Sequence, residues 1–133
     1  MINRQGIMLR LLLSLLIVGA FAQCSTEDSF GQLDLKKWRS DRGGCNGVRA
    51  TLEPAFRAEV QNLKGKTSNT LGEWLGRPDA NVLADRSQKF YVYYFERGPQ
   101  CEQSGAKSKS RSVAIRFSAL GIATEITFQN GLP

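Results

Sequence analysis

The chain has 133 residues, 41% of them hydrophobic, and its 18 Lys and Arg outnumber its 12 Asp and Glu. It contains no His, which removes the commonest general base and the commonest metal ligand, and its three Cys do not form a zinc pattern. The composition therefore argues against an enzyme, and we expect no catalytic residues, no metal and no cofactor.

The first 22 residues have the profile of an export signal. Arg4 and Arg10 precede an apolar run of twelve residues at positions 11–22. A membrane-spanning helix needs roughly 20 apolar residues, although counting back to Ile7 leaves a signal anchor as an alternative. Removing this segment takes two of the 18 basic residues and leaves 16 against 12 acidic ones. That excess suits an anionic surface but is smaller than a nucleic-acid binder requires.

Two processing routes end near residue 22, and the sequence favours neither. Ala20 and Ala22 are the small residues that signal peptidase requires at positions −3 and −1. The following Cys24 also lies in a lipobox-like segment and is a candidate for lipidation, although Gln23 suits that motif poorly. Lipidation would leave Cys45 and Cys101 as an even pair. In an oxidising compartment we expect these two to form a disulfide; the alternative is two separate buried thiols.

We expect residues 23–48 to form a tether and N-terminal segment ahead of a folded domain at residues 49–133. Within the segment, Asp34 can cap a short helix over residues 35–41. Trp38 is expected to pack this helix onto the domain.

Two amphipathic helices are expected next. Over residues 51–63, apolar side chains recur every three or four positions. The charged Glu53 and Glu59 lie six residues apart on this helix and are expected to be solvated, not to form a carboxylate pair. A second helix is started by Thr67 and ended by Gly76 and Pro78.

Four strands follow the helices. Residues 81–85 are a weak candidate, whereas residues 89–97 are strongly β-prone and apolar on both faces, which marks a central strand. Residues 112–118 and 122–129 each alternate an apolar with a polar face, and Ala123 falls on the polar face. Because two short helices cover only one side of such a meander, the expected fold class is α+β, a two-layer sandwich with the two N-terminal helices on one face of a four-stranded antiparallel sheet.

A candidate binding patch lies on one face of the central strand. The charges at its two ends suggest that this face is open, and dense exposed aromatic residues usually indicate a contact surface. The alternative is that the three rings pack beneath Trp38 and the N-terminal segment. The patch consists of Lys89, Tyr91, Tyr93, Phe95 and Arg97.

Two stretches also match a known pattern. The first, at residues 63–78, has the form G-x-T…LG-x-P, and the second is the closing hairpin at residues 112–126, with the aromatic strand between them. In this order they resemble the SmpA/OmlA (BamE-like) family of small outer-membrane lipoproteins, one of which is a subunit of the β-barrel assembly machinery. The resemblance covers about half of the chain, and residues 30–49 have no counterpart in it. The matching positions are caps, turns and core residues: Gly65, Thr67, Leu71, Leu75, Gly76, Pro78, Phe117, Gly121, Ile122 and Ile126.

The resemblance implies an exported cell-envelope protein on the periplasmic side of the outer membrane. Such a protein would act by protein–protein contact, as an accessory in outer-membrane protein assembly or envelope integrity. The helix–helix–four-strand unit is also similar to one repeat of the β-lactamase inhibitor protein. That likeness implies the alternative, a secreted or soluble periplasmic binding or inhibitor module. Neither alternative implies nucleic acid or metal as a partner.

Overall fold

The computed structural model describes residues 26–133. The predictions on residues 1–22 and on Cys24 lie outside this range. No helix within it is long and apolar enough to cross a membrane. The first half of the described chain contains a hairpin of two two-residue strands, three helices and a 3-10 turn: β1 (Ser29–Phe30), β2 (Leu33–Asp34), α2 (Leu35–Ser40), η1 (Arg42–Gly44), α3 (Val48–Leu63) and α4 (Ser68–Leu75).

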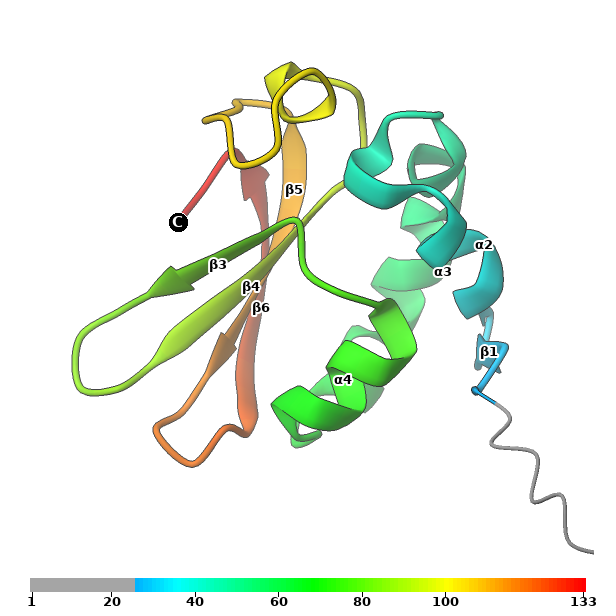
Figure 1. Ribbon diagram of the computed structural model, residues 1–133. Helices are drawn as coiled ribbons and strands as arrows, with labels where there is room; N and C mark the ends of the chain where they lie inside the picture. The colour runs from blue at the N-terminus through cyan, green and yellow to red at the C-terminus, as the bar shows by residue number, and fades with distance from the viewer. Residues whose placement is uncertain (1–25) are drawn as a thin grey trace, which may run out of the picture.

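Four antiparallel strands form the second half of the chain, in the order β3-β4-β5-β6. The helices lie together on one face of this sheet (Figure 1). The expected α+β fold, with the helices preceding a four-stranded meander, is therefore confirmed. The strands and a second 3-10 turn are β3 (Ala80–Leu83), β4 (Lys89–Tyr94), η2 (Pro99–Cys101), β5 (Arg111–Phe117) and β6 (Ala123–Asn130).

The ends of the helices follow from their capping residues. The Asp34 carboxylate accepts a hydrogen bond from the Lys37 backbone N–H at 2.9 Å and so caps α2. The Thr67 hydroxyl does the same for α4, with the Thr70 N–H at 3.1 Å. Helix α4 ends at Gly76, whose positive φ of 78° suits glycine. The sequence predicted all three of these features.

The core lies between the helices and the sheet and is rich in aromatic side chains. Trp38 packs against Phe56 and Phe95, with ring centroids 4.9 Å and 5.7 Å apart. Helix α3 contributes Phe56 and Leu63 from its apolar face, as its spacing predicted. The side chains of β5 that point toward these helices are fully buried: Val113, Ile115 and Phe117.

Residues 29–41 belong to the same core as the rest of the domain. Leu33, Leu35 and Trp38 have no exposed surface and pack with the side chains of α3 and the sheet. The short helix at residues 35–41 is observed as α2, and Trp38 packs it onto the domain as expected. The α+β unit of residues 49–133 therefore shares its core with the segment that precedes it.

The last strand differs from its predicted alternation at one position. Phe117 pairs with Ala123 and Arg116 with Glu125, so the register shifts by one residue at Thr124. Side chains alternate between the two faces of a strand. Because a bulge inserts one unpaired residue, the residues before it change face relative to the simple alternation of the residues after it. Ala123 is consequently buried in the core with Phe117, and its expected place on the polar face is wrong.

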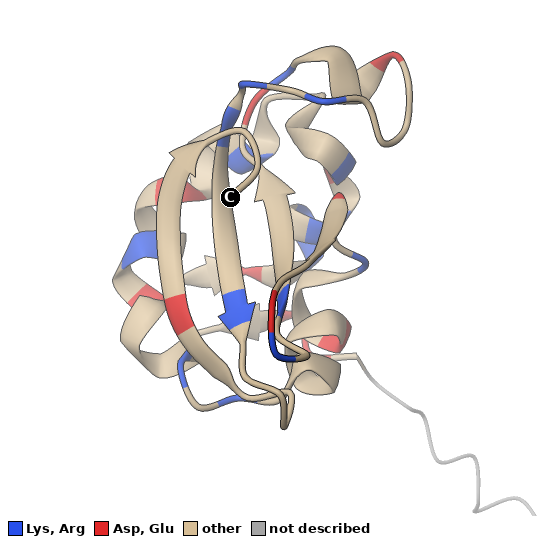
Figure 2. Cartoon of the chain, turned by 90° about the vertical axis from the view of Figure 1, so that its left-hand side faces the viewer, with Lys and Arg blue, Asp and Glu red and all other residues tan. Residues whose placement is uncertain are grey.

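We call the side of the sheet that points away from the helices the open face. The C-terminal residues curl over its upper end, as Figure 2 shows. There the Ser112 hydroxyl donates to the Gly131 carbonyl at 2.6 Å, and the Gly131 N–H donates to the Ser110 carbonyl at 2.9 Å. By strand register the open face comprises Ala80, Val82, Phe90, Val92, Tyr94, Ser112, Ala114, Arg116, Glu125, Thr127 and Gln129.

Candidate functional site

The aromatic residues of the predicted patch lie in the core. Tyr93 and Phe95 have no exposed surface, and both rings pack near Trp38. Tyr91 is half-buried against Phe117, with ring centroids 4.7 Å apart. The structure therefore corrects the expectation that this face is open and supports the alternative, packing beneath Trp38.

The two charged members of the patch explain why the sequence suggested an open face. Lys89 lies at the start of β4, where its Nζ donates to the Tyr91 hydroxyl at 3.3 Å. Arg97 lies beyond the other end of β4 and donates to the Cys45 carbonyl at 3.3 Å. The charges thus mark the ends of the strand, and the helices cover only the part between them.

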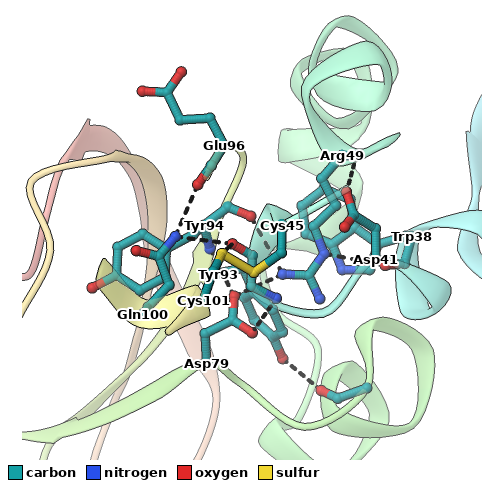
Figure 3. A network of polar contacts seen from close by, with 12 residues as sticks. Trp38, Asp41, Cys45, Arg49, Asp79, Tyr93, Tyr94, Glu96, Gln100 and Cys101 are labelled. Atoms are coloured by element: carbon teal, nitrogen blue, oxygen red, sulfur yellow. Dashed lines mark hydrogen bonds and ion pairs between the residues drawn. A yellow bond between two sulfur atoms is a disulfide. The ribbon is translucent and has the colours of Figure 1, made fainter. Parts of the chain in front are cut away.

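Cys45 and Cys101 form the predicted disulfide, with their Cα atoms 5.7 Å apart. Cys45 follows η1, and Cys101 ends η2 in the connection between β4 and β5. The bond joins two connections that lie 56 residues apart in the sequence. It is drawn beside the buried polar network in Figure 3.

That network centres on an ion pair between Arg49 and Asp79. The Arg49 guanidinium lies 2.7 Å from the Asp79 carboxylate, and the side chains are 1% and 4% exposed. The same guanidinium donates from Nε to the Trp38 carbonyl at 3.1 Å. The Asp79 carboxylate also accepts from the backbone N–H groups of Tyr94 and Gly43, at 2.8 Å and 3.0 Å. The pair thereby joins α3 to the residue before β3, to β4 and to η1 (Figure 3).

A second buried carboxylate completes the network. Asp41 accepts from the backbone N–H groups of Asn46 and Arg49, at 2.7 Å and 2.9 Å. Helix α3 begins after Gly47, which has no side chain to cap it, so Asp41 supplies the missing acceptor from six residues earlier. Neither Asp41 nor the pair Arg49 and Asp79 was predicted from the sequence as part of a site. The uncapped start of α3 at Gly47 is the signal that could have led to Asp41.

Glu53 and Glu59 are buried, which corrects the expectation that they are solvated. The Asn62 side-chain amide donates to Glu59 at 2.9 Å and the Gln32 backbone N–H donates at 3.0 Å, and these bonds lower the pKa of Glu59. Glu53 instead forms ion pairs with Arg57 and Arg111. The two carboxylates therefore have separate partners.

The tyrosines near the network are suited to donate hydrogen bonds and unsuited to act as bases. Burial raises the pKa of Tyr93, whose hydroxyl donates to the Gly76 carbonyl at 2.9 Å. Burial also raises the pKa of Tyr94, whose hydroxyl has no partner within residues 26–133. Both hydroxyls therefore stay protonated at neutral pH. In the same part of the chain, no three His, Cys, Asp or Glu residues are placed to hold a metal ion.

Two adjoining hollows have volumes of about 200 and 340 Å³, and the smaller one opens beside the disulfide. We call the larger one the β3 cleft, because it lies at the start of that strand. The smaller hollow is lined by the disulfide and Gln100. The side chain of Asp79 reaches both hollows, but its carboxylate is already engaged by Arg49. The β3 cleft is bordered by Arg42, Arg77, Asn81, Tyr91, Ser104 and Gly105.

Comparison with known proteins gives no match: no family model fits the chain, and no curated protein or solved structure is significantly similar. The resemblance to the SmpA/OmlA family therefore depends on the residues quoted from the sequence. In the structure these residues serve the fold. Thr67 and Gly76 delimit α4, and Gly121, with a φ of 75°, lies in the turn between β5 and β6.

Proposed function

We propose that the chain is an exported cell-envelope protein that acts by binding another protein, as an accessory in outer-membrane protein assembly or envelope integrity. The observation that carries this proposal is the one-sided covering of the sheet. All the described helices lie on one face (Figure 1). On the opposite face Val92, Tyr94, Ser112 and Ala114 are buried, whereas Glu125 and Thr127 are exposed and Phe90 and Arg116 are partly exposed. The exposed part of such a sheet face offers a rigid surface for a partner.

The uncovered part of the open face carries side chains that are common at protein contacts. A hollow of about 430 Å³ lies at its lower end and includes Phe90 and Arg116. The Arg116 guanidinium lies 5.9 Å from the Phe90 ring and donates to the Gln88 side chain at 2.7 Å. Aromatic and arginine side chains are enriched among the residues that dominate binding energy. Because Gln88 and Phe90 already hold the Arg116 side chain in place, less side-chain entropy is lost when a partner binds.

The disulfide and the export signal support a location outside the cytoplasm. Disulfides persist in oxidising compartments such as the periplasm, and small exported domains use them to offset a limited core. Residues 1–22 supply the signal profile for such a route. Attachment to the outer membrane through Cys24 belongs to the proposal, and Cys24 lies outside the described residues.

Affinity purification tests the proposed contact. The tagged full chain would be cross-linked in intact cells of its own species and recovered from solubilised membranes. We expect a barrel-assembly component in the eluate. Phe90→Ser and Thr127→Trp should remove it, because both alter the open face. Leu120→Ser is the matched control, since Leu120 is 89% exposed in the β5–β6 turn and outside that face. Recovery without any barrel-assembly component would count against the assembly role.

The alternative is a secreted binding or inhibitor module that uses the same open face against a soluble target. The disulfide within the folded domain favours it, because such bonds are typical of small secreted domains. Labelling of cells with a fatty-acid analogue separates the two proposals. Label that is lost in a Cys24→Ala variant would support the membrane-attached protein and contradict the secreted module.

A further inference from the structure

Strand β3 is an edge of the sheet with unused backbone groups. The Ala84 N–H donates to the Gln88 carbonyl at 2.8 Å across the β3–β4 turn. Because an antiparallel ladder alternates, the N–H and C=O groups of Val82 then point toward β4, and those of Asn81 and Leu83 point outward. No partner for these outward groups is found within residues 26–133.

Apart from its short length of four residues, the edge lacks the usual protection against pairing. Natural edge strands are commonly blunted by a charged side chain, a proline or a bulge. The four residues Ala80–Leu83 contain neither a charge nor a proline, and their pairing with β4 is regular. Leu83 is 82% exposed, so an apolar side chain stands at this edge in contact with water.

Two arginines lie at the start of this edge. Arg42 and Arg77 are exposed and border the β3 cleft, and neither forms an ion pair in the described part of the chain. The carboxylate that reaches the cleft, Asp79, is neutralised by Arg49. The cleft therefore has a net positive charge next to an unpaired strand end. Arginines bind carboxylates and phosphates through two parallel hydrogen bonds, and a carboxylate is the one of these groups that every protein chain carries at its C-terminus.

We propose that β3 binds an extended segment of another protein as an added antiparallel strand, with a carboxylate at the C-terminal end of that segment held by Arg42 and Arg77. The direction follows from charge. In antiparallel pairing the C-terminal end of the guest lies at the start of β3, beside the arginines, whereas parallel pairing would bring an N-terminal ammonium group there. Strand addition of this kind uses backbone hydrogen bonds for affinity and end groups for specificity. The inference rests on the proposed function and adds the β3 edge to the open face as a second contact surface.

The test uses fluorescent peptides and the oxidised, exported protein. The first probe is Thr-Val-Thr-Val-Thr-Val-Thr with a free C-terminus. The second is the same peptide with a C-terminal amide, and the third is the amide with Glu as its last residue. Anisotropy gives the affinities, and hydrogen exchange reports the backbone N–H groups of Asn81 and Leu83. Comparing the first and third probes distinguishes a C-terminal carboxylate from a side-chain carboxylate.

Three variants isolate the contacts. Leu83→Pro removes an outward N–H and keeps the bonds to β4, so binding of every probe should be lost. Leu83→Ala is its matched control, because it keeps the N–H and should change affinity less than about threefold. The double variant Arg42→Gln, Arg77→Gln should weaken each carboxylate probe that binds more tightly than the amide, about tenfold or more, and leave the amide probe unchanged.

We expect at least one carboxylate probe to bind more tightly than the amide and to protect both N–H groups. Undiminished binding to Leu83→Pro, or equal affinities for all three probes, would overturn the inference. So would a dimer, seen by light scattering, that Leu83→Pro dissociates, because the edge would then pair with a second copy. If no peptide binds while Phe90→Ser and Thr127→Trp still abolish the cross-link to the envelope partner, only the inference fails. If that cross-link is absent as well, the proposed function fails with it.

Discussion

At the scale of single residues, Arg49 shows how buried charge organises this protein. Its guanidinium is almost completely buried, lies 4.7 Å from the centre of the Trp38 ring and forms the ion pair with Asp79. A charge in such a place is stable only while its partner remains, because desolvation has already cost several kcal/mol. The main effect of the pair is therefore to hold α3, β3 and β4 in their relative positions. Its contribution to net stability is small.

We predict that Arg49→Met destabilises the protein by about 3–5 kcal/mol, because it leaves Asp79 buried without its counter-charge. Urea unfolding measures this loss. Adding Asp79→Asn should recover part of it, since the amide removes the isolated charge. Arg57→Met is the control on the same helix. The Arg57 side chain is 52% exposed, and the variant should lose no more than about 1 kcal/mol of unfolding free energy. An Arg49→Met variant as stable as that control would show that the buried pair is unimportant.

A second prediction concerns pH and Glu59. Its pKa is lower in the folded protein than in the unfolded chain, so its contribution to stability is present above its ordinary pKa of about 4.3. That contribution is lost as the pH falls through the lower, folded value. Glu59→Gln should therefore be less stable than the wild type at pH 6 and should lose less stability between pH 6 and pH 3. Unfolding free energies at both pH values measure this difference.

Glu73→Gln is the control for this experiment. Glu73 is exposed on α4 and forms no ion pair within the described residues, so its variant should follow the wild-type pH dependence. Identical pH dependence in Glu59→Gln and the wild type would contradict the role assigned to the hydrogen bonds from Asn62 and Gln32.

At the scale of elements, η1 approaches the sheet closely because it contains glycine. Gly44 has a φ of 68°, and a Cβ added to it would lie 2.5 Å from the Phe95 carbonyl carbon and 2.8 Å from the Tyr94 oxygen. Gly47, just before α3, has a similar φ of 76°, but a Cβ there would meet nothing within 4 Å. The two positions share backbone strain and differ only in the space around them.

We predict that Gly47→Ala lowers the stability of the folded protein by about 1–2 kcal/mol, from backbone strain alone. Gly44→Ala should cost roughly a further 1–3 kcal/mol, because η1 or β4 must move to relieve the clash. Thermal unfolding of the two variants in parallel makes this comparison. Equal losses would mean that η1 and β4 are not in close contact.

The elements themselves were largely predictable from local signals. Thr67, Gly76 and Pro78 delimited α4, and the alternation of residues 112–118 gave β5 its buried face. The bulge at Thr124 was not predictable, because the shift in register is set by the partner strand and by the strand-like bridge between Thr67 and Ile122. Which face of β4 the helices cover was also undetermined locally, since both of its faces are apolar and both contribute buried residues, such as Tyr93 and Val92.

At the scale of the whole molecule, the fold class followed from the order of the elements, whereas the candidate surfaces did not. The buried ion pair and the β3 cleft combine residues from η1, α3, β3 and the β4–β5 connection, and no sequence spacing brings these together. The predicted patch failed for the same reason: Trp38 lies more than 50 residues before Tyr93 and covers it only after folding. The complete arrangement is a sheet with its helices on one side, a partly exposed face on the other, and an unpaired edge at β3.

The most direct test of this account is site-specific photocross-linking in living cells of the native species. A photoreactive amino acid would be placed at Thr127, exposed on the open face, and in a second strain at Asn69, exposed on α4. We predict that position 127 forms an adduct with one envelope protein, identifiable by mass spectrometry, and that position 69 forms none. Adducts from position 69 alone, or equally from both positions, would contradict the claim that the protein acts through the uncovered side of its sheet.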